Sequence, residues 1–445
     1  MRIVFFSTNS NSYEGEFASF TLPECRDQWQ EVAALHPEHE IIIATQLPGN
    51  FLLDLDGGKF SGGAEKIKYV ILKSDDAEMI ADEIALLKPD FVFAASFWVA
   101  PFDWLPVKDS LIGELLSEKG IRAICHPSES ALDCFDKFRT NIILKELGIN
   151  VAAAVYVNHE LFLKTKKGVN VNVYRELVLK KIRRMHFPLI IKDTVGLSSY
   201  GMQVVEDYRQ AEYLLTSKRN NSDRIVEEYI PGIQFGTEIY GCSENYKVMP
   251  PFMFSVNRYG ITSPKQSVKF GPVTNPEFKF DELEKILLRI AGHFSFNGIA
   301  QFDLVFSNGK WFVIEINPRI SGMTSTYAAA LGMTPARLIF EVALLCSGNE
   351  SDSFSHEKSL TMNFKFPVIP KEKMQQLKEL PFVKYLNQIE NLVAKQERET
   401  GYCESVISDA STPGKLLDHL EEIKNKFPEI IEPVFWDNAK KMLIF

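Results

Sequence analysis

The segment from residue 301 to residue 319, QFDLVFSNGKWFVIEINPR, limits most narrowly what this chain can fold into. It predicts two apolar β-strands joined by a turn at residues 307–309. Strand side chains alternate between two faces, so Glu315 and Asn317 share one face of the second strand. With that turn, Asp303 of the first strand falls roughly opposite Glu315.

Two carboxylates that face each other repel unless a cation lies between them. Oxygen ligands of this kind, supplemented by phosphate oxygens, suit magnesium better than zinc. Asn317 adds a neutral oxygen, and Arg319 adds a planar guanidinium that binds phosphate or carboxylate. We therefore predict a metal site here. The alternative is a surface hairpin with solvated acids, which the many apolar neighbours in both strands disfavour.

Length and composition are those of an ordinary globular protein with more than one domain. The chain has 445 residues, of which 45% are hydrophobic and 24% charged. Its net charge of -9, with both signs interspersed, argues against a nucleic-acid partner. The six cysteines form no CxxC pair, so we expect reduced thiols in a cytoplasmic protein. No signal peptide is visible and no apolar stretch approaches the ~20 residues of a membrane span, so we expect no membrane partner.

The pattern along the chain predicts an α/β protein with three parts. Residues 1–125 alternate short β-rich runs with helical patterns, which predicts a parallel sheet covered by helices. Residues 126–346 are expected to form the second domain, with a smaller lobe at about 150–230. A polar linker then leads to a C-terminal lobe at 359–445. The Gly- and Asp-rich segment 50–63 is expected to be a loop outside the first sheet.

A Gly/Ser-rich segment, DTVGLSSYG, directly follows Lys192 at the end of an apolar strand. Its backbone N–H groups can form an anion-binding nest, to which Ser198 and Ser199 add hydroxyls and Gly201 a close backbone approach. Lys192 would then bind a phosphate. The segment is no Walker loop, and the absence of GxGxxG after the first strand disfavours a dinucleotide fold. A hairpin turn without a ligand is the alternative.

The segment 224–235, RIVEEYIPGIQF, predicts an apolar strand that ends in two acids and then bends. A strand edge presents a carbonyl and an N–H group two residues apart, and these can pair with the edge of an adenine. Glu228 and Ile230 would provide the two groups, whereas the Glu227 side chain would point the other way. An ordinary surface strand end is the alternative.

Lys137 stands at the start of a predicted helix, where the helix N-terminus would itself favour an anion, although a solvated first turn is the alternative. The order of these parts, with the hairpin last, resembles the ATP-grasp superfamily. The resemblance covers about residues 120–345, with 1–120 as a preceding αβα lobe. DLVFSNGKWFVIEINPR is similar to the metal hairpin of the biotin carboxylase and carbamoyl phosphate synthetase branch.

The resemblance implies an ATP-grasp fold: an N-terminal parallel αβα lobe, a small lid lobe, a central antiparallel-sheet lobe and a C-terminal extension. It also implies roles for the residues found above. By position, the magnesium ligands are Asp303, Glu315 and Asn317, and the two phosphate lysines are Lys137 and Lys192. The adenine-binding strand contains Glu227, Glu228 and Ile230, and Arg319 lies beside the transferred phosphate. Gln234 stands where the family often has a glutamate for the ribose hydroxyls, and Glu238 is the other candidate for that role.

Enzymes of this superfamily mostly activate a carboxylate with ATP, and an amine then attacks the acyl phosphate. Such a site must neutralise the γ-phosphate and hold the acceptor oxygen in line, with Lys192 and Arg319 as the catalytic cations. The Gly/Ser loop would close over the phosphates and exclude water. The resemblance thus implies ATP and Mg²⁺ (or Mn²⁺) as cofactors, a small-molecule carboxylate and amine as substrates, and a homodimer through the first lobe.

The tail refines the expected substrate class. Residues 401–423, GYCESVISDASTPGKLLDHLEEI, are similar to the C-terminal lobe of L-amino-acid ligases, as is the SGMTSTYAAALGM run after Arg319. We therefore favour a ligase of amino-acid-like substrates, with residues 321–324 and 259–269 shaping the acceptor pocket. One alternative is a bicarbonate-phosphorylating carboxylase or carbamoyl-type enzyme, although the chain has one ATP-grasp unit and no biotinyl Met-Lys-Met motif. The other is a non-catalytic ATP-binding scaffold, which the complete acid–acid–Asn set disfavours.

Overall fold

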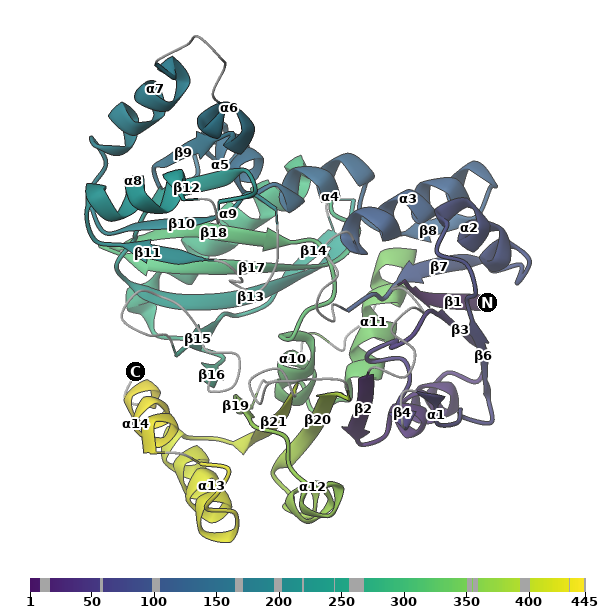
Figure 1. Ribbon diagram of the computed structural model, residues 1–445. Coiled ribbons are helices and arrows are strands. Elements are labelled where there is room, and N and C mark those ends of the chain that lie inside the picture. The colour runs from purple at the N-terminus through teal and green to yellow at the C-terminus, as the bar shows by residue number, and fades with distance from the viewer. Residues whose placement is uncertain are drawn as a thin grey trace.

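The computed structural model describes most of the chain, as three sheets with helices packed on them (Figure 1). The described residues are 1–8, 17–56, 59–97, 105–164, 171–195, 202–217, 220–243, 245–255, 268–349, 354, 359–392, 401–431 and 433–443. Ser198, Ser199 and Gly201 of the predicted phosphate loop lie outside these residues, as does most of the segment 259–269.

The first sheet is parallel, with strand order β6-β3-β1-β7-β8. Its strands read as nearly continuous apolar runs because helices cover both faces, and this confirms the expected αβα lobe. The elements of this lobe are β1 (Arg2–Ser7), α1 (Cys25–Leu35), β3 (Glu40–Thr45), β6 (Ile67–Ile71), α2 (Ala77–Ala85), β7 (Phe91–Ala94), α3 (Leu105–Glu118), β8 (Arg122–Ile124) and α4 (Ser128–Phe135).

One expectation for this lobe was wrong. The segment 50–63 is not only a loop, because it contains the short strands β4 (Leu55–Asp56) and β5 (Lys59–Phe60). These strands, with β2 (Phe17–Leu22), extend the edge of the largest sheet. The pairing partner of β2 is β20 (Val383–Asn391), which lies far away in the sequence and could not be found from local turn signals.

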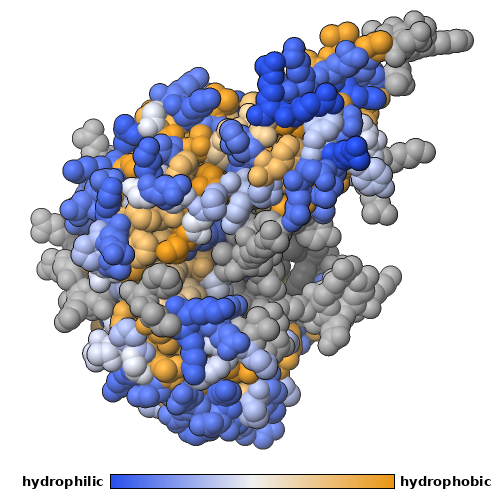
Figure 2. All heavy atoms as spheres, turned by 90° about the vertical axis from the view of Figure 1, so that its left-hand side faces the viewer, coloured by the Kyte–Doolittle hydropathy of each residue, from blue (hydrophilic) through white to orange (hydrophobic). Residues whose placement is uncertain are grey.

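The second sheet is antiparallel, with order β11-β10-β12-β9, and it forms a lid lobe that projects from the rest (Figure 1). Figure 2 shows this projection at the upper right, with many hydrophilic side chains on its surface. Its elements are α5 (Lys137–Glu146), β9 (Ala154–Val157), α6 (His159–Leu163), α7 (Val173–Ile182), β10 (Leu189–Asp193), β11 (Gln203–Val205), α8 (Tyr208–Thr216) and β12 (Arg224–Glu228). Phe162, Ile182 and Leu215 pack into a core of its own.

The third sheet runs from the central lobe into the C-terminal part without a break, in the order β18-β17-β13-β15-β16-β19-β21-β20 and then β2-β4-β5. The expected three-part division of the chain therefore stays a prediction. The elements are β13 (Ile233–Cys242), β14 (Asn245–Val248), β15 (Phe252–Phe254), β16 (Val268–Gly271), the 3-10 turn η2 (Pro276–Phe278), α9 (Phe280–His293), β17 (Gly298–Ser307), β18 (Lys310–Asn317), β19 (Leu360–Phe366), α12 (Lys371–Lys378), β21 (Gly401–Ala410), α13 (Pro413–Lys426) and α14 (Pro433–Met442).

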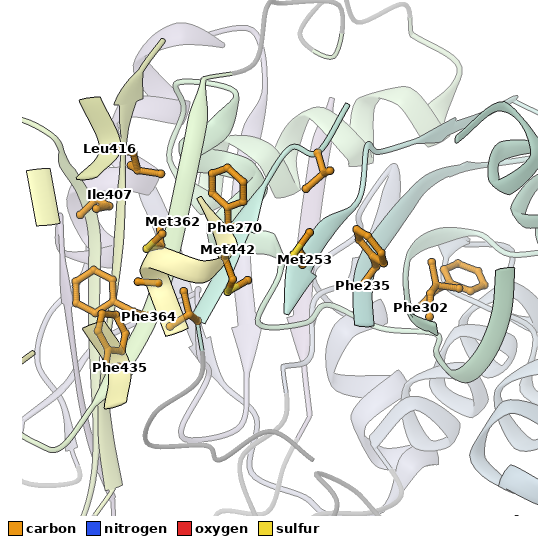
Figure 3. Close-up of a cluster of buried hydrophobic side chains, with 14 of the residues drawn as sticks. Phe235, Met253, Phe270, Phe302, Met362, Phe364, Ile407, Leu416, Phe435 and Met442 are labelled. Atoms are coloured by element: carbon orange, nitrogen blue, oxygen red, sulfur yellow. The ribbon is translucent and has the colours of Figure 1, made fainter. Parts of the chain in front are cut away.

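The two faces of this sheet differ in chemistry. One face carries alternating apolar residues, among them Phe235, Met253, Phe270 and Phe364, which pack with Phe435 and other residues of the C-terminal helices (Figure 3). The opposite face carries the intervening residues of the same strands. Because strand side chains alternate, burying one face fixes which residues line the other.

Two apolar helices connect this second face to the first lobe. These are α10 (Thr324–Ala330) and α11 (Pro335–Ser347), and most of their residues are buried within the protein. No single helix of the described residues is long and apolar enough to cross a membrane. Only this pair passes together on length and composition, and it is bent by 93°.

Candidate active site

The hairpin of β17 and β18 places the two predicted carboxylates face to face. Asp303 pairs with Glu315 in the antiparallel register, as expected from the sequence. The turn between the strands holds Asn308 and Gly309 at φ of 49° and 72°, in the left-handed region that a tight hairpin turn requires. A bulge between Asp303 and Leu304 shifts the register, and a bulge of this kind re-aims neighbouring side chains.

The two carboxylates have different electrostatic surroundings, which shift their pKa values in opposite directions. Burial raises the pKa of Asp303 to about 6, and the nearby charge of Glu315 acts in the same direction. Burial also acts to raise the pKa of Glu315, but the charges of Lys137 and Lys192 outweigh it and lower this pKa. Lys137 Nζ lies 3.4 Å from Glu315 Oε1. Glu315 is thus the ionised member of the pair, and Asp303 is the member that needs a further positive charge to ionise fully.

A chain of side-chain hydrogen bonds holds the predicted metal ligands. Gln301 donates to Asp303 Oδ1 through Nε2 at 2.8 Å and accepts at Oε1 from Asn317 Nδ2 at 2.9 Å. Arg319 Nη2 donates in turn to Asn317 Oδ1 at 3.2 Å. Gln301 therefore orients two of the three ligands from the side. The Arg319 Nε is buried and has no hydrogen-bond partner among the described residues.

Lys192 enters the site from the lid lobe. Its Nζ lies 2.7 Å from Glu227 Oε2, and both side chains are almost fully buried. Burial acts to lower the pKa of Lys192, but the charges of Glu227 and Glu315 outweigh it, so that the net shift is upward. The backbone N–H of Lys137 also donates to Thr194 O at 2.8 Å, which fixes the start of α5 against the base of the predicted phosphate loop. Both predicted phosphate lysines thus converge on Glu315.

The end of β12 has the alternation expected of an adenine-binding strand. Glu227 points toward Lys192, whereas Glu228 Oε1 accepts from the backbone N–H of His186 at 2.8 Å. The N–H of Glu228 is used in the sheet, where it donates to Ala153 O. Ile230 N–H has no backbone partner among the described residues. That group therefore remains a candidate donor for a base.

The two ribose candidates lie in different settings. Gln234 pairs with Val305 near the start of β13, at the half-buried end of the strand. Glu238 is fully buried, and its carboxylate accepts hydroxyl hydrogen bonds from Tyr240 at 2.6 Å and from Ser321 and Thr324 at 2.8 Å each. The Ser321 and Thr324 bonds tie Glu238 to the segment that follows Arg319. The ribose role of Glu238 therefore stays a prediction, as does that of Gln234.

A small cleft joins the site to the first lobe, and sequence reasoning missed it. Ser96, Asp109 and His126 line it on one side, and Arg319 and Ile320 on the other. The first group lies at or just beyond the carboxyl ends of β7 and β8 and near the start of α3. Ligands of open parallel sheets bind beyond these strand ends, at the point where the strand order reverses. The predicted parallel sheet was one signal, but the strand order came only from the structure.

Comparison with known proteins gives one family and several distant relatives. Residues 134–323 match the family model of the ATP-grasp domain. The carbamoyl phosphate synthase large chain of Thermomicrobium roseum is 27% identical over 168 residues, 37% of this chain but only 15% of that one. The D-alanine–D-alanine ligase of Buchnera aphidicola is 26% identical over 217 residues, 47% of this chain and 67% of that one. This chain thus matches only a small part of the carbamoyl phosphate synthase relatives.

Solved structures resemble nearly the whole chain. The L-amino acid ligase from Bacillus licheniformis has a TM-score of 0.63 at 16% identity, with 94% of this chain and 96% of that one covered. The N5-carboxyaminoimidazole ribonucleotide synthetase from Thermus thermophilus also has a TM-score of 0.63, at 12% identity, with 97% and 99% covered. Likeness at such low identity shows a shared fold. The match includes the first lobe and the C-terminal strands.

Proposed function

Because this chain belongs to the ATP-grasp superfamily, we propose that it is an ATP-dependent ligase that activates a carboxylate as an acyl phosphate and couples it to an amine. The observation that carries the proposal is the in-register pair of Asp303 and Glu315. Lys137 and Lys192 converge on this pair, and Arg319 is bonded to Asn317 beside it. A surface hairpin would have no reason to gather these cations around two acids.

The oxygen donors of the hairpin fit magnesium. Two carboxylates face each other, and the Asn317 amide oxygen accepts a hydrogen bond from Arg319, whose place a metal cation could take. Burial and the charge of Glu315 raise the pKa of Asp303, so a cation bound between the two carboxylates would stabilise their ionised forms. Asp303, Glu315 and Asn317 would hold the metal, and Mn²⁺ has similar ligand preferences. The chemistry that such a metal would supply is neutralisation of the negative charge on the phosphate groups.

The protein's own residues then have separate tasks. Lys137 and Lys192 bind phosphate oxygens, and Arg319 holds the acceptor carboxylate in line. An oxygen of that carboxylate attacks the γ-phosphorus, the bond to the bridging oxygen breaks, and ADP leaves. The amine nitrogen next attacks the acyl carbon, phosphate leaves, and the nitrogen loses a proton. Glu228, Ile230 and Gln234 would hold the nucleoside at the far end.

We further propose substrates that resemble amino acids. Two comparisons support this class: the D-alanine–D-alanine ligase that matches about half of this chain, and the L-amino acid ligase whose fold matches nearly all of it. The C-terminal segment 401–423, similar in sequence to the C-terminal lobe of L-amino-acid ligases, forms β21 and most of α13, with Thr412 and Pro413 at the helix start. A shared fold alone does not select the acid or the amine.

A second candidate is phosphorylation of bicarbonate. It is favoured by the carbamoyl phosphate synthase relatives and by the full-length likeness to a carboxyaminoimidazole ribonucleotide synthetase. Both candidates use the same nucleotide site and differ only in the acceptor. The first lobe, which lines the cleft at Arg319, would in either case contact that acceptor.

The test is a screen of amino-acid pairs, and of bicarbonate with amines, for release of ADP, with mass detection of the product. Release that depends on two amino acids and yields a dipeptide or amide supports the ligase. Release that depends on bicarbonate supports the second candidate instead. ATP binding with no release under any condition would leave the non-catalytic scaffold as the better description.

A further inference from the structure

A second group of charges, one buried and two partly buried, lies beside the proposed site, in strands that the proposed mechanism does not use. We name Lys269 of β16, Lys365 of β19 and Glu404 of β21 the lysine cluster. Lys269 pairs with Asn363 across β16 and β19, and Lys365 pairs with Glu404 across β19 and β21. Paired residues point to the same face of a sheet, as do residues two apart in a strand. The three charged side chains therefore share one face.

This face is also the face of the proposed metal site. Asp303 pairs with Gly236 of β13, and Gly236 pairs with Phe252 of β15. Phe254, two residues on, pairs with Lys269. The alternation thus carries the same face from the hairpin to the lysine cluster. The charge of Asp303 acts on Lys269, which confirms that the two groups are close.

The lysine cluster has more positive than negative charge. Burial lowers the pKa of Lys269 to about 8, and Glu404 opposes this only in part. Lys269 Nζ donates to Gly322 O at 3.0 Å, and no carboxylate of a described residue lies within 4.0 Å of it. Lys365 Nζ lies 3.9 Å from Glu404 Oε2, beyond hydrogen-bond distance. Among the described residues, Glu404 is thus the one carboxylate within 4.0 Å of either ammonium group, and it makes no hydrogen bond to them, while the charges of Asp303 and Glu238 also act on Lys269.

Glu404 is held by neighbours and not by the lysines. Its Oε1 accepts from Asn363 Nδ2 and, at 3.4 Å, from Ser325 Oγ. Asn363 Oδ1 is buried without a hydrogen-bond partner among the described residues. The two ammonium groups lie over aromatic rings, Lys269 over Phe254 and Lys365 over Tyr402. Both lysines are partly buried, and withdrawing a cation from water without a bonded anion is costly, which favours an anion supplied by a ligand.

The position of the lysine cluster identifies that anion. Gly322, to which Lys269 donates, comes three residues after Arg319. A ligand anion at the lysines would thus belong to a molecule that also reaches the acyl group at Arg319. We propose that Lys269 and Lys365 form the subsite for the carboxylate of the amine-bearing substrate, an α-amino acid. This inference rests on the proposed ligase function. It means that the C-terminal strands select the second substrate.

The test separates the two half-reactions with hydroxylamine. Hydroxylamine attacks an acyl phosphate at carbon, releases phosphate and forms a hydroxamate, and it has no carboxylate. With the acceptor amino acid found in the screen, Lys365→Met should raise the KM by about tenfold or more, because a charge-assisted hydrogen bond is lost. The same shift is expected for Lys269→Met. With hydroxylamine, which lacks the carboxylate, wild type and variants should have similar and high KM values for the amine.

Two further variants keep the result interpretable. Lys365→Met removes one of the two cations near Glu404, so Lys365→Met/Glu404→Gln is made as well, and Lys365→Arg should restore most of the affinity. Lys373→Met of α12, an exposed lysine paired with Glu429, is the matched control and should change neither reaction. An unchanged KM for the amino acid in folded Lys365→Met and Lys269→Met, with normal hydroxamate formation, overturns the subsite alone. If the wild-type protein forms no hydroxamate with any of the carboxylates offered, the proposed ligase function itself is overturned.

Discussion

Lys192 and Glu227 form a buried ion pair inside the lid sheet, with 2.7 Å between Nζ and Oε2. The residues are diagonal neighbours on adjacent antiparallel strands, since Lys192 pairs with Ile225 and Glu227 with Ile190. The pair joins the predicted phosphate lysine to the predicted adenine strand. Under the proposed function, this one contact would couple nucleotide binding to the stability of the lid.

Breaking this pair should destabilise the protein more than replacing it. Lys192→Met leaves Glu227 buried and unpaired, so we expect the free energy of unfolding to fall by about 3–5 kcal/mol. Lys192→Met/Glu227→Leu removes both charges and should recover part of that loss, while ADP release stays abolished in both. Urea denaturation measures the energies. Lys373→Met breaks an exposed pair and should cost at most about 1 kcal/mol. Equal losses in the single and double variants would contradict this reading of the pair.

Glu315→Gln should abolish ADP release and leave the fold intact. The amide keeps the shape of the side chain but removes the charge that Lys137 and Lys192 surround. We expect a loss of turnover on the order of a hundredfold to a thousandfold, as for other groups that stabilise a transition state by charge. Coupled ADP detection gives the rate, and circular dichroism gives the fold. Glu282→Gln on the exposed face of α9 is the control. Turnover within about twofold of wild type would remove the hairpin from the mechanism.

Gln301→Ala should weaken the response to magnesium more than it lowers the maximal rate. Gln301 touches Asp303 and Asn317 through both ends of its amide, so its loss frees two predicted ligands to rotate. Outer partners of this kind change metal affinity by about 10–100-fold. The measurement is ADP release as a function of Mg²⁺ concentration at saturating ATP. If the half-maximal Mg²⁺ concentration is unchanged, the hydrogen-bond chain has no part in metal binding.

Asp109 should make the stability of the first lobe depend on pH. Burial raises its pKa to about 7, opposed by hydrogen bonds from Ser96 and Thr8. The folded state therefore binds the proton more tightly than the unfolded state. The corresponding stability is fully present below about pH 4 and is lost as pH rises to about 7, with an upper limit of about 4 kcal/mol. Asp109→Asn should flatten this part of the melting profile between pH 4 and pH 8. Parallel profiles for wild type and variant would show that the carboxyl stays in one protonation state.

Local sequence patterns were sufficient for the hairpin and for most helices. The Asn308-Gly309 turn brings the two strands together, and its register alone would set Asp303 opposite Ile314; the bulge between Asp303 and Leu304 shifts the register so that Glu315 faces Asp303. The helix at Phe280–His293 follows in the same way from its amphipathic period. By contrast, the strand at Val383–Asn391 was missed, because its pairing with Phe17–Leu22 joins segments that have no common local signal.

The sequence by itself determined which residue types carry the chemistry: two acids, an asparagine and an arginine in one hairpin, and two lysines ahead of it. These assignments depend on alternation, turn geometry and order along the chain, all of which are local. Only the tertiary structure decided that Glu238 is enclosed by hydroxyls, that Gln301 links two predicted ligands, and that Lys269, Lys365 and Glu404 share a face with Asp303. Burial and cross-strand neighbours are set by pairing between distant segments, and no local pattern encodes that pairing.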